Sequence, residues 1–85
     1  MNETEIGTVR HFFDKISVVL IELTAGDLAI GDTIHIKGHT TDITMTVESL
    51  QIKQDKLTQA VKGQSVGTKI PGKAREHDKV FKVTA

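Results

Sequence analysis

The sequence predicts a small all-β domain in which short strands curl into a closed β-barrel. The chain has 85 residues, enough for one domain. Its glycines separate runs rich in Val, Ile, Thr and Phe, which is the pattern of short strands joined by turns, and no run carries a strong helical signal. Because a closed sheet has no exposed edges, we favour a barrel over an open sandwich of the same strands. The prediction treats residues 1–85 as one domain, with its core at about residues 5–84.

Three strands are predicted in the first half of the chain. The first covers residues 5–13 and the second residues 16–23. The second is apolar at both odd and even positions, as in a central strand that is covered on both faces. Turns follow at residues 24–27 and 31–32. The third strand, residues 34–37, alternates isoleucine with polar residues and is expected to be half-buried.

The run at residues 43–53 is irregular. Its apolar positions change from odd to even numbers: Ile43, Met45 and Val47, then Leu50 and Ile52. A pleated strand cannot change parity unaided, so we predict a β-bulge or sharp bend near residues 48–49, of the kind that curls a sheet. Residues 57–61 are ambiguous between a strand and a helical turn. The last strands are predicted at residues 64–70 and 80–83.

Composition excludes several classes of site. The absence of cysteine removes disulfides, thiolate metal sites and cysteine nucleophiles. The acidic start lacks the features of a signal peptide, and the longest apolar run, residues 16–23, is too short to span a bilayer. We therefore expect a cytoplasmic protein with no membrane partner. Because a small barrel is filled by its own side chains, we also expect no cofactor and predict that the chain is not an enzyme.

The two halves of the chain differ in charge although the whole is neutral. Residues 1–48 hold three basic and eight acidic residues, and residues 49–85 hold eight basic and three acidic ones. Such asymmetry indicates a surface for nucleic acid or an anionic protein, unless the halves interleave and neutralise each other. With three Phe and no Trp or Tyr, base stacking is poorly provided for. RNA binding would be phosphate-directed and salt-sensitive, through four residues: Lys69, Lys73, Arg75 and Lys82.

Phe12 and Phe13 are adjacent, so on a strand they point to opposite faces. One is expected in the core. The other, taken as Phe13, is a candidate contact for a protein partner. The alternative is that strand twist buries both.

Residues 67–74 imitate a phosphate-binding loop. The segment reads GTKIPGKA, with Ala74 where such a loop carries the hydroxyl that binds magnesium. Pro71 removes a backbone N–H, and the few residues that follow end in a strand, not a helix. A hairpin turn is the ordinary interpretation, and we expect no nucleotide.

Two further groupings of polar residues are weak candidates for chemistry. His35 and His39, with Asp42 nearby, could bind zinc. However, His35 faces outward on a strand and no further ligand is forced near, so surface histidines and no metal are expected. A triad of three nearby residues can also be drawn, but no strained nucleophile turn or oxyanion-hole signature supports it. Its members would be His11, Asp14 and Ser17.

Four stretches carry a resemblance to a known family: IGTV at residues 6–9, LAIGDTIHIKG at 28–38, VESL at 47–50 and AVKGQSVG at 60–67. In order and spacing they resemble the second domain of translational GTPases such as elongation factor Tu. A closely related barrel is the C-terminal domain of some collagenase-like peptidase-family proteins, several of which act in RNA modification. The chain looks most like small stand-alone translation elongation factor-like proteins. The resemblance covers about residues 6–83.

The resemblance implies a six-stranded Greek-key barrel. It does not carry over GTP hydrolysis, because the nucleotide-binding domain is missing. In the elongation factor a glutamate and an arginine help to hold the aminoacyl end of tRNA. The corresponding positions here are about Gln51 and Gln54, and neither is charged. The family's usual Gly-Asp pair before the last strand is replaced by His77 and Asp78.

Two functions are predicted. The first is a binding module that contacts tRNA, rRNA or a ribonucleoprotein through a phosphate-directed basic surface. The alternative is a protein-interaction module that docks on an RNA-modifying or peptidase-family-like enzyme, or on a translation factor, using Phe13.

Overall fold

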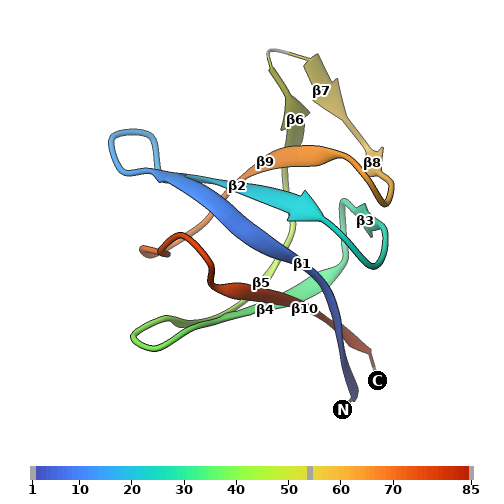
Figure 1. Cartoon of the computed structure of the whole chain (residues 1–85). Helices are drawn as coiled ribbons and strands as arrows, with labels where there is room; N and C mark the ends of the chain where they lie inside the picture. The colour runs from blue at the N-terminus through green and yellow to red at the C-terminus, as the bar shows by residue number, and fades with distance from the viewer. Residues whose placement is uncertain (1, 54, 85) are drawn as a thin grey trace.

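The computed structural model describes residues 2–53 and 55–84, which form ten β-strands and no helix (Figure 1). The strands are β1 (Asn2–Phe13), β2 (Val18–Leu23), β3 (Leu28–Ala29), β4 (Thr33–Lys37), β5 (Asp42–Thr46), β6 (Leu50–Ile52), β7 (Asp55–Leu57), β8 (Gln59–Ala60), β9 (Ser65–Lys69) and β10 (Lys79–Thr84). In these described ranges there is no helix of the length and apolar character that crossing a membrane requires.

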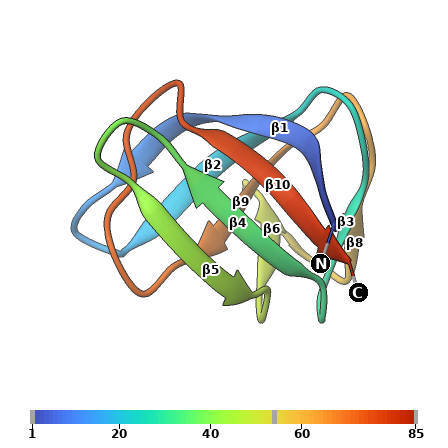
Figure 2. The same ribbon diagram turned by 90° about the horizontal axis from the view of Figure 1, so that it is seen from below.

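Eight strands form one curled antiparallel sheet in the order β5-β4-β10-β1-β2-β9-β6-β7, and β3 pairs with β8 in a separate ribbon. β1 is the longest strand and serves both halves of the sheet. Its residues 2–8 pair with β10 and its residues 7–13 pair with β2. Register shifts along β1 mark the places where it bends between these neighbours. Seen from below, β5, β4, β10 and β1 wrap around the interior, with β2 and β9 behind them (Figure 2).

The all-β prediction is confirmed, and six strands have five or more residues. The sheet differs from a closed barrel, however. Among the described residues the hydrogen-bonded order ends at β5 on one side and at β7 on the other, with no ladder between them. The physical reason lies in the short strands at that end. β6 and β7, each three residues long, form a hairpin that extends away from β5 in Figure 1.

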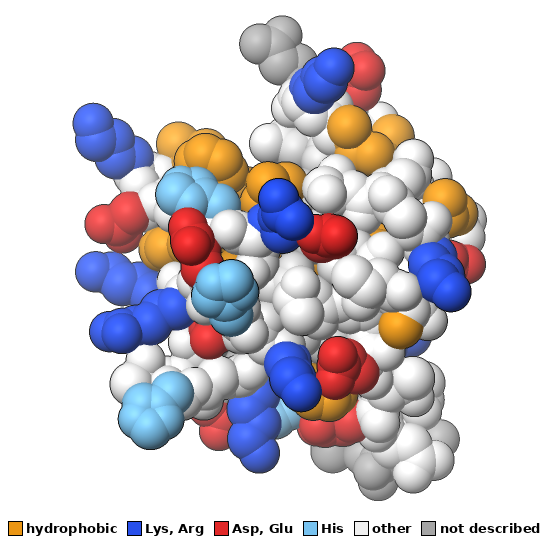
Figure 3. Space-filling view, viewed as in Figure 1, with side chains coloured by type: hydrophobic (Ala, Val, Ile, Leu, Met, Phe, Trp, Pro, Cys, Tyr) orange, Lys and Arg blue, Asp and Glu red, His pale blue; other side chains and the backbone are white. Residues whose placement is uncertain are grey.

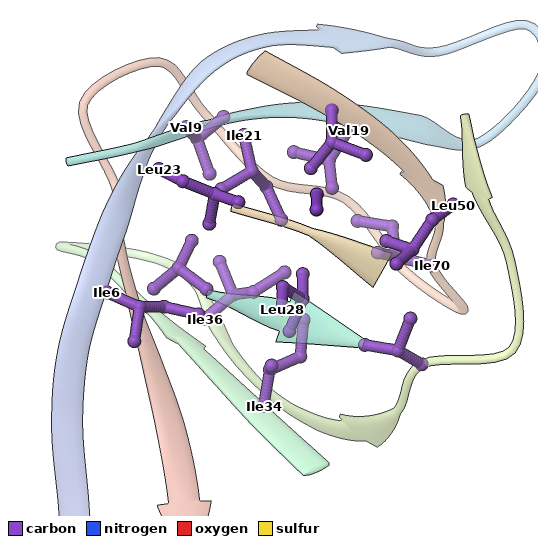
Figure 4. Packing of buried hydrophobic residues seen from close by; sticks show 14 of the residues in the cluster. Ile6, Val9, Val19, Ile21, Leu23, Leu28, Ile34, Ile36, Leu50 and Ile70 are labelled. Carbon is purple, nitrogen blue, oxygen red and sulfur yellow. The ribbon is translucent and has the colours of Figure 1, made fainter. Parts of the chain in front are cut away.

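The core fills the inside of this curl. Side chains from β1, β2 and β4 converge on Leu28 of β3, which is fully buried (Figure 4). Period-two alternation explains the arrangement, because alternate residues of a strand face the same side. In β4 the predicted pattern is confirmed: Ile34 and Ile36 are buried.

The parity change in residues 43–53 is sharper than a bulge. β5 ends at Thr46, and a new strand, β6, begins at Leu50. Between them Val47 is buried and tied to the β3–β4 turn. Its amide donates to the Asp32 carbonyl (2.8 Å), and its carbonyl accepts from the Gly31 amide (2.9 Å). The chain thereby stops pairing with β4 and continues as β6, which pairs with β9. The residue pattern predicts only a bulge or bend at this point.

β2 differs from its prediction. Its odd-numbered residues are buried and its even-numbered ones are only partly covered, so the strand is not enclosed on both faces. The ambiguous residues 57–61 hold the end of β7 and the short strand β8, and no helical turn.

Candidate functional site

An apolar hollow lies on the outer face of the sheet, where β1, β2, β9 and β6 run side by side. Its volume is about 240 Å³. The lining residues are Phe13, Ile16, Val18, Leu20, Gln51, Lys53 and Gly67. All but two of these are apolar or glycine, and Lys53 supplies the single charge. We call this site the β2 hollow.

Gly67 forms the floor of the β2 hollow. It lies opposite Leu20 of β2 and opposite Gln51 of β6 in the sheet register. A Cβ atom built at this position would lie 3.2 Å from Val18 Cγ1 and 3.5 Å from Gln51 Cγ. The first distance is tighter than an ordinary van der Waals contact and the second is an ordinary one, so a side chain at residue 67 would occupy the space. The hollow therefore exists because residue 67 is glycine.

Phe13 and Ile16 form the rim. Phe13 is 43% exposed and Ile16 is 56% exposed, whereas Phe12 is partly buried against the core. The two phenylalanines thus divide between the faces, as expected for neighbours on a strand. Ser17 has a φ of 55° in the tight turn that joins β1 to β2. Figure 3 shows hydrophobic side chains at the surface beside this turn, among Lys, Arg and His side chains.

The four predicted RNA contacts do not lie in one group. Lys73 and Arg75 line an open hollow together with Asp14. Lys69 ends β9 and Lys82 lies on β10, and β1 and β2 separate these two strands in the sheet. The structure therefore brings two of the four together.

Basic residues of the second half lie beside acidic residues of the first half. Among the described residues, three pairs of a lysine with a carboxylate join the halves: Lys73 with Asp14 (4.0 Å), Lys79 with Glu5 (3.7 Å) and Lys82 with Asp32 (3.3 Å). They arise partly because β10 is hydrogen-bonded between β1 and β4. The interleaving of the two halves is thus the interpretation that the geometry supports.

The candidate zinc ligands do not converge. His35 Nε2 lies 2.5 Å from Asp42 Oδ1, and its Nδ1 lies 2.9 Å from Glu3 Oε2. Because the two ring nitrogens point in different directions, these carboxylates cannot meet at one ion. His39 takes no part in this cluster. Within residues 2–53 and 55–84, no group of three or more His, Asp or Glu side chains is arranged to hold a metal ion.

The drawn triad and the loop-like segment have other structural roles. His11 Nδ1 lies 3.3 Å from Glu76 Oε1, and the carboxylate of Asp14 faces Lys73. In the segment 67–74, the first three residues belong to β9, and no helix follows them in the described part of the chain. Neither grouping presents the geometry of its supposed chemistry.

Sequence reasoning missed most of the β2 hollow. The sequence predicts that Val18 and Leu20 lie on one of two covered faces of their strand, and it places Gly67 inside the strand at residues 64–70 with no sign that it borders a hollow. A strand that is apolar on both faces in a chain too small for a second layer is the signal that could have found the site. Gln51 is part of the lining, whereas Gln54 lies outside the described residues.

Comparison with known proteins gives relatives for nearly the whole chain. No protein-family model matches it. It is 46% identical over 78 residues, 91% of its length, to an uncharacterized protease of Methanocaldococcus jannaschii. It is 31% identical over 81 residues, 94% of its length, to a collagenase of Porphyromonas gingivalis. The chain spans about a fifth of these relatives, 19% and 22% of their respective lengths.

A solved structure shares the fold. It is the C-terminal domain of a Geobacillus thermoleovorans protein that is assigned to the U32 peptidases. The TM-score is 0.85 at 15% sequence identity, and the match covers 93% of this chain and 91% of that domain. An identity this low shows a common fold and nothing more specific.

These comparisons correct one prediction and support part of another. The prediction that the chain is not an enzyme is wrong, because the relatives that it matches are named as a protease and as collagenases. The collagenase-like part of the predicted resemblance is confirmed. None of these relatives is named as a translation factor, so the elongation-factor part stays a prediction. Over nearly its whole length, the chain is similar to a domain-sized part of proteins named as proteases and collagenases.

Proposed function

We propose that this chain is a docking domain of a protease- or collagenase-like enzyme, and that the β2 hollow receives an apolar side chain from the enzyme body. The enzyme body means the part that corresponds to the rest of the relatives' length, about four-fifths of it. The observation that carries the proposal is the exposed rim of Phe13 and Ile16 around a hollow floored by Gly67.

The chemistry of the β2 hollow suits a protein contact. Apolar surface in a concave site gains free energy when a complementary side chain excludes water from it. Aromatic residues at such sites often carry much of the binding energy of an interface. Lys53 at the edge can approach a carboxylate of the partner, but exposed ion pairs contribute little, so burial of the rim is the main source of affinity.

Phosphate-directed RNA binding has less support. Lys73 and Arg75 share their hollow with Asp14, and Lys82 lies 3.3 Å from Asp32. Acidic neighbours lower the local positive potential on which phosphate binding depends.

The test is a binding titration between the chain and the separately produced enzyme body, followed by calorimetry. Phe13→Asp places a charge in the rim and is expected to weaken binding by about tenfold or more, or about 1.4 kcal/mol. Gly67→Val fills the floor and is expected to weaken binding as well. Val61→Asp is the matched control, because Val61 is 47% exposed and does not line the hollow.

The control variant should bind within about twofold of the unaltered chain. The proposal fails if Phe13→Asp, shown to be folded by circular dichroism, binds the enzyme body as the unaltered chain does. It also fails if the unaltered chain binds nucleic acid and not the enzyme body.

A further inference from the structure

His35 lies between two carboxylates that come from different parts of the sheet. It is on the outward face of β4, yet its side chain is only 13% exposed. Its Nδ1 lies 2.9 Å from Glu3 Oε2 of β1, and its Nε2 lies 2.5 Å from Asp42 Oδ1 of β5. Since the strand order is β5-β4-β10-β1, one side chain connects contacts across four strands.

Both contacts require the imidazolium form. A carboxylate ion can only accept hydrogen bonds, and a neutral imidazole has one N–H and one bare nitrogen. Neutral His35 can therefore donate to Glu3 or to Asp42, while its other nitrogen faces an oxygen lone pair. The doubly protonated ring donates to both, and its positive charge strengthens each bond.

Other charged groups on this outward face lie beside groups of opposite charge. Lys79 of β10 lies 3.7 Å from Glu5 of β1, and Lys37 of β4 is opposite Asp42 in the register. The ring of Phe81 on β10 lies beside His35, with 6.3 Å between ring centroids. His35 is thus the group whose charge can change near neutral pH in this cluster.

The segments held by His35 are at the margins of the sheet. In the described part of the chain, β5 is an edge strand that pairs only with β4. Among residues 2–53 and 55–84, the sole strand that pairs with residues 2–5 of β1 is β10, because the pairing with β2 begins at Gly7. Strands with one hydrogen-bonded neighbour open at lower free energy than those inside a sheet. A side-chain link to such strands therefore controls how often they open.

We infer that His35 is a pH-sensitive latch, which in its protonated form fastens the edge strand β5 and the first residues of β1 to β4. The inference is independent of the docking proposal, because none of these residues lines the β2 hollow.

The direction of the pH effect follows from the cluster. The hydrogen bond to Asp42 raises the pKa of His35 above its ordinary value of 6.5, partial burial opposes the rise, and Glu3 adds to it. A group with a raised pKa in the folded state contributes stability that is fully present below its unfolded-state pKa. That stability is lost as the pH rises through the raised pKa, so alkaline pH opens the latch.

The test is amide hydrogen exchange of the whole chain from pH 5.5 to 9, expressed as protection factors, which divide out the intrinsic pH dependence of exchange. Protection in residues 43–46 is expected to fall by about three- to tenfold as His35 loses its proton, the loss of about one hydrogen bond. Protection in β2 should not change. His35→Gln should abolish the pH dependence in β5.

His11→Gln is the matched control, because His11 contacts one carboxylate, Glu76, and is half exposed. It should leave the pH dependence of β5 intact. Should His35→Gln fail to fold, a second measurement stands alone: the NMR titration midpoint of His35 should fall in Asp42→Asn and in Glu3→Gln. The inference is overturned if the titration midpoint of His35 in both variants equals that in the unaltered chain. It is also overturned if protection in β5 is independent of pH in the unaltered chain.

Discussion

Gly7 occupies the place where β1 passes from one neighbouring strand to the other. It pairs with Val80 of β10 and with Leu23 of β2, next to a register shift in β1. A Cβ atom at this position would overlap the backbone carbonyl oxygen of Glu22. Backbone atoms inside a sheet cannot move aside as a flexible side chain can. The close approach of β1 and β2 thus requires glycine at residue 7.

Gly7→Ala is expected to lower the free energy of unfolding by about 2 kcal/mol or more, because the strands must separate to admit the methyl group. Urea denaturation measures the change. Gly72→Ala is the control, since its Cβ would meet only the end of the Ile43 side chain, at 3.2 Å from Cδ1. The control should cost less than about 0.5 kcal/mol. Equal midpoints for both variants would show that the approach of the two strands is not tight.

At the scale of single elements, β4 was predictable and β2 was not. In β4 the alternation of isoleucine with polar residues predicts both that the segment is a strand and which of its faces is buried. In β2 both faces are apolar, and local sequence cannot tell a covered face from one that awaits a partner. That distinction depends on whether another layer lies above Val18 and Leu20, which is a property of the whole chain.

The junction between β5 and β6 is the second element-scale feature. The parity change predicts a break in the strand, and the structure has one. The backbone groups that bond to Val47 there belong to Asp32 and Gly31, in a turn that is distant in the sequence. Hydrophobic pattern shows where a strand cannot continue. It does not show which backbone groups will form hydrogen bonds with the residue that leaves the strand.

Val47→Ala is expected to destabilise the chain by about 2 kcal/mol, because it removes two buried methyl groups at this junction. Val61→Ala makes the same chemical change at a residue that is 47% exposed and should cost less than about 0.5 kcal/mol. Thermal unfolding followed by circular dichroism compares the two. A loss of equal size in both variants would mean that Val47 does not anchor the junction.

At the scale of the whole molecule, the all-β fold class was easier to predict than closure of the sheet. Strands need only local runs of residues, whereas closure needs the first and last strands of the ladder to meet with matching register. Here β7 is three residues long and β5 ends where Val47 turns inward, and the described ladder stays open between them.

The distribution of charge is also a property of the whole molecule. In sequence the two halves carry opposite net charges, but β10 lies between β1 and β4 and brings the halves together. The ion pair of Lys82 with Asp32 is one result, and both side chains are largely covered. Opposite charges this close weaken each other's field within a Debye length of about 10 Å.

The whole chain is therefore expected to bind polyanions weakly. Fluorescence anisotropy with labelled tRNA at 50 mM salt should give a dissociation constant weaker than about 10 μM, within the range of non-specific binding. Lys73→Glu combined with Arg75→Glu removes the one pair of predicted contacts that the structure brings together, and should change the anisotropy little. Tight binding that weakens steeply with salt and disappears in this double variant would contradict the expectation. It would show that the basic residues act together despite Asp14, and would restore phosphate-directed RNA binding as the leading function.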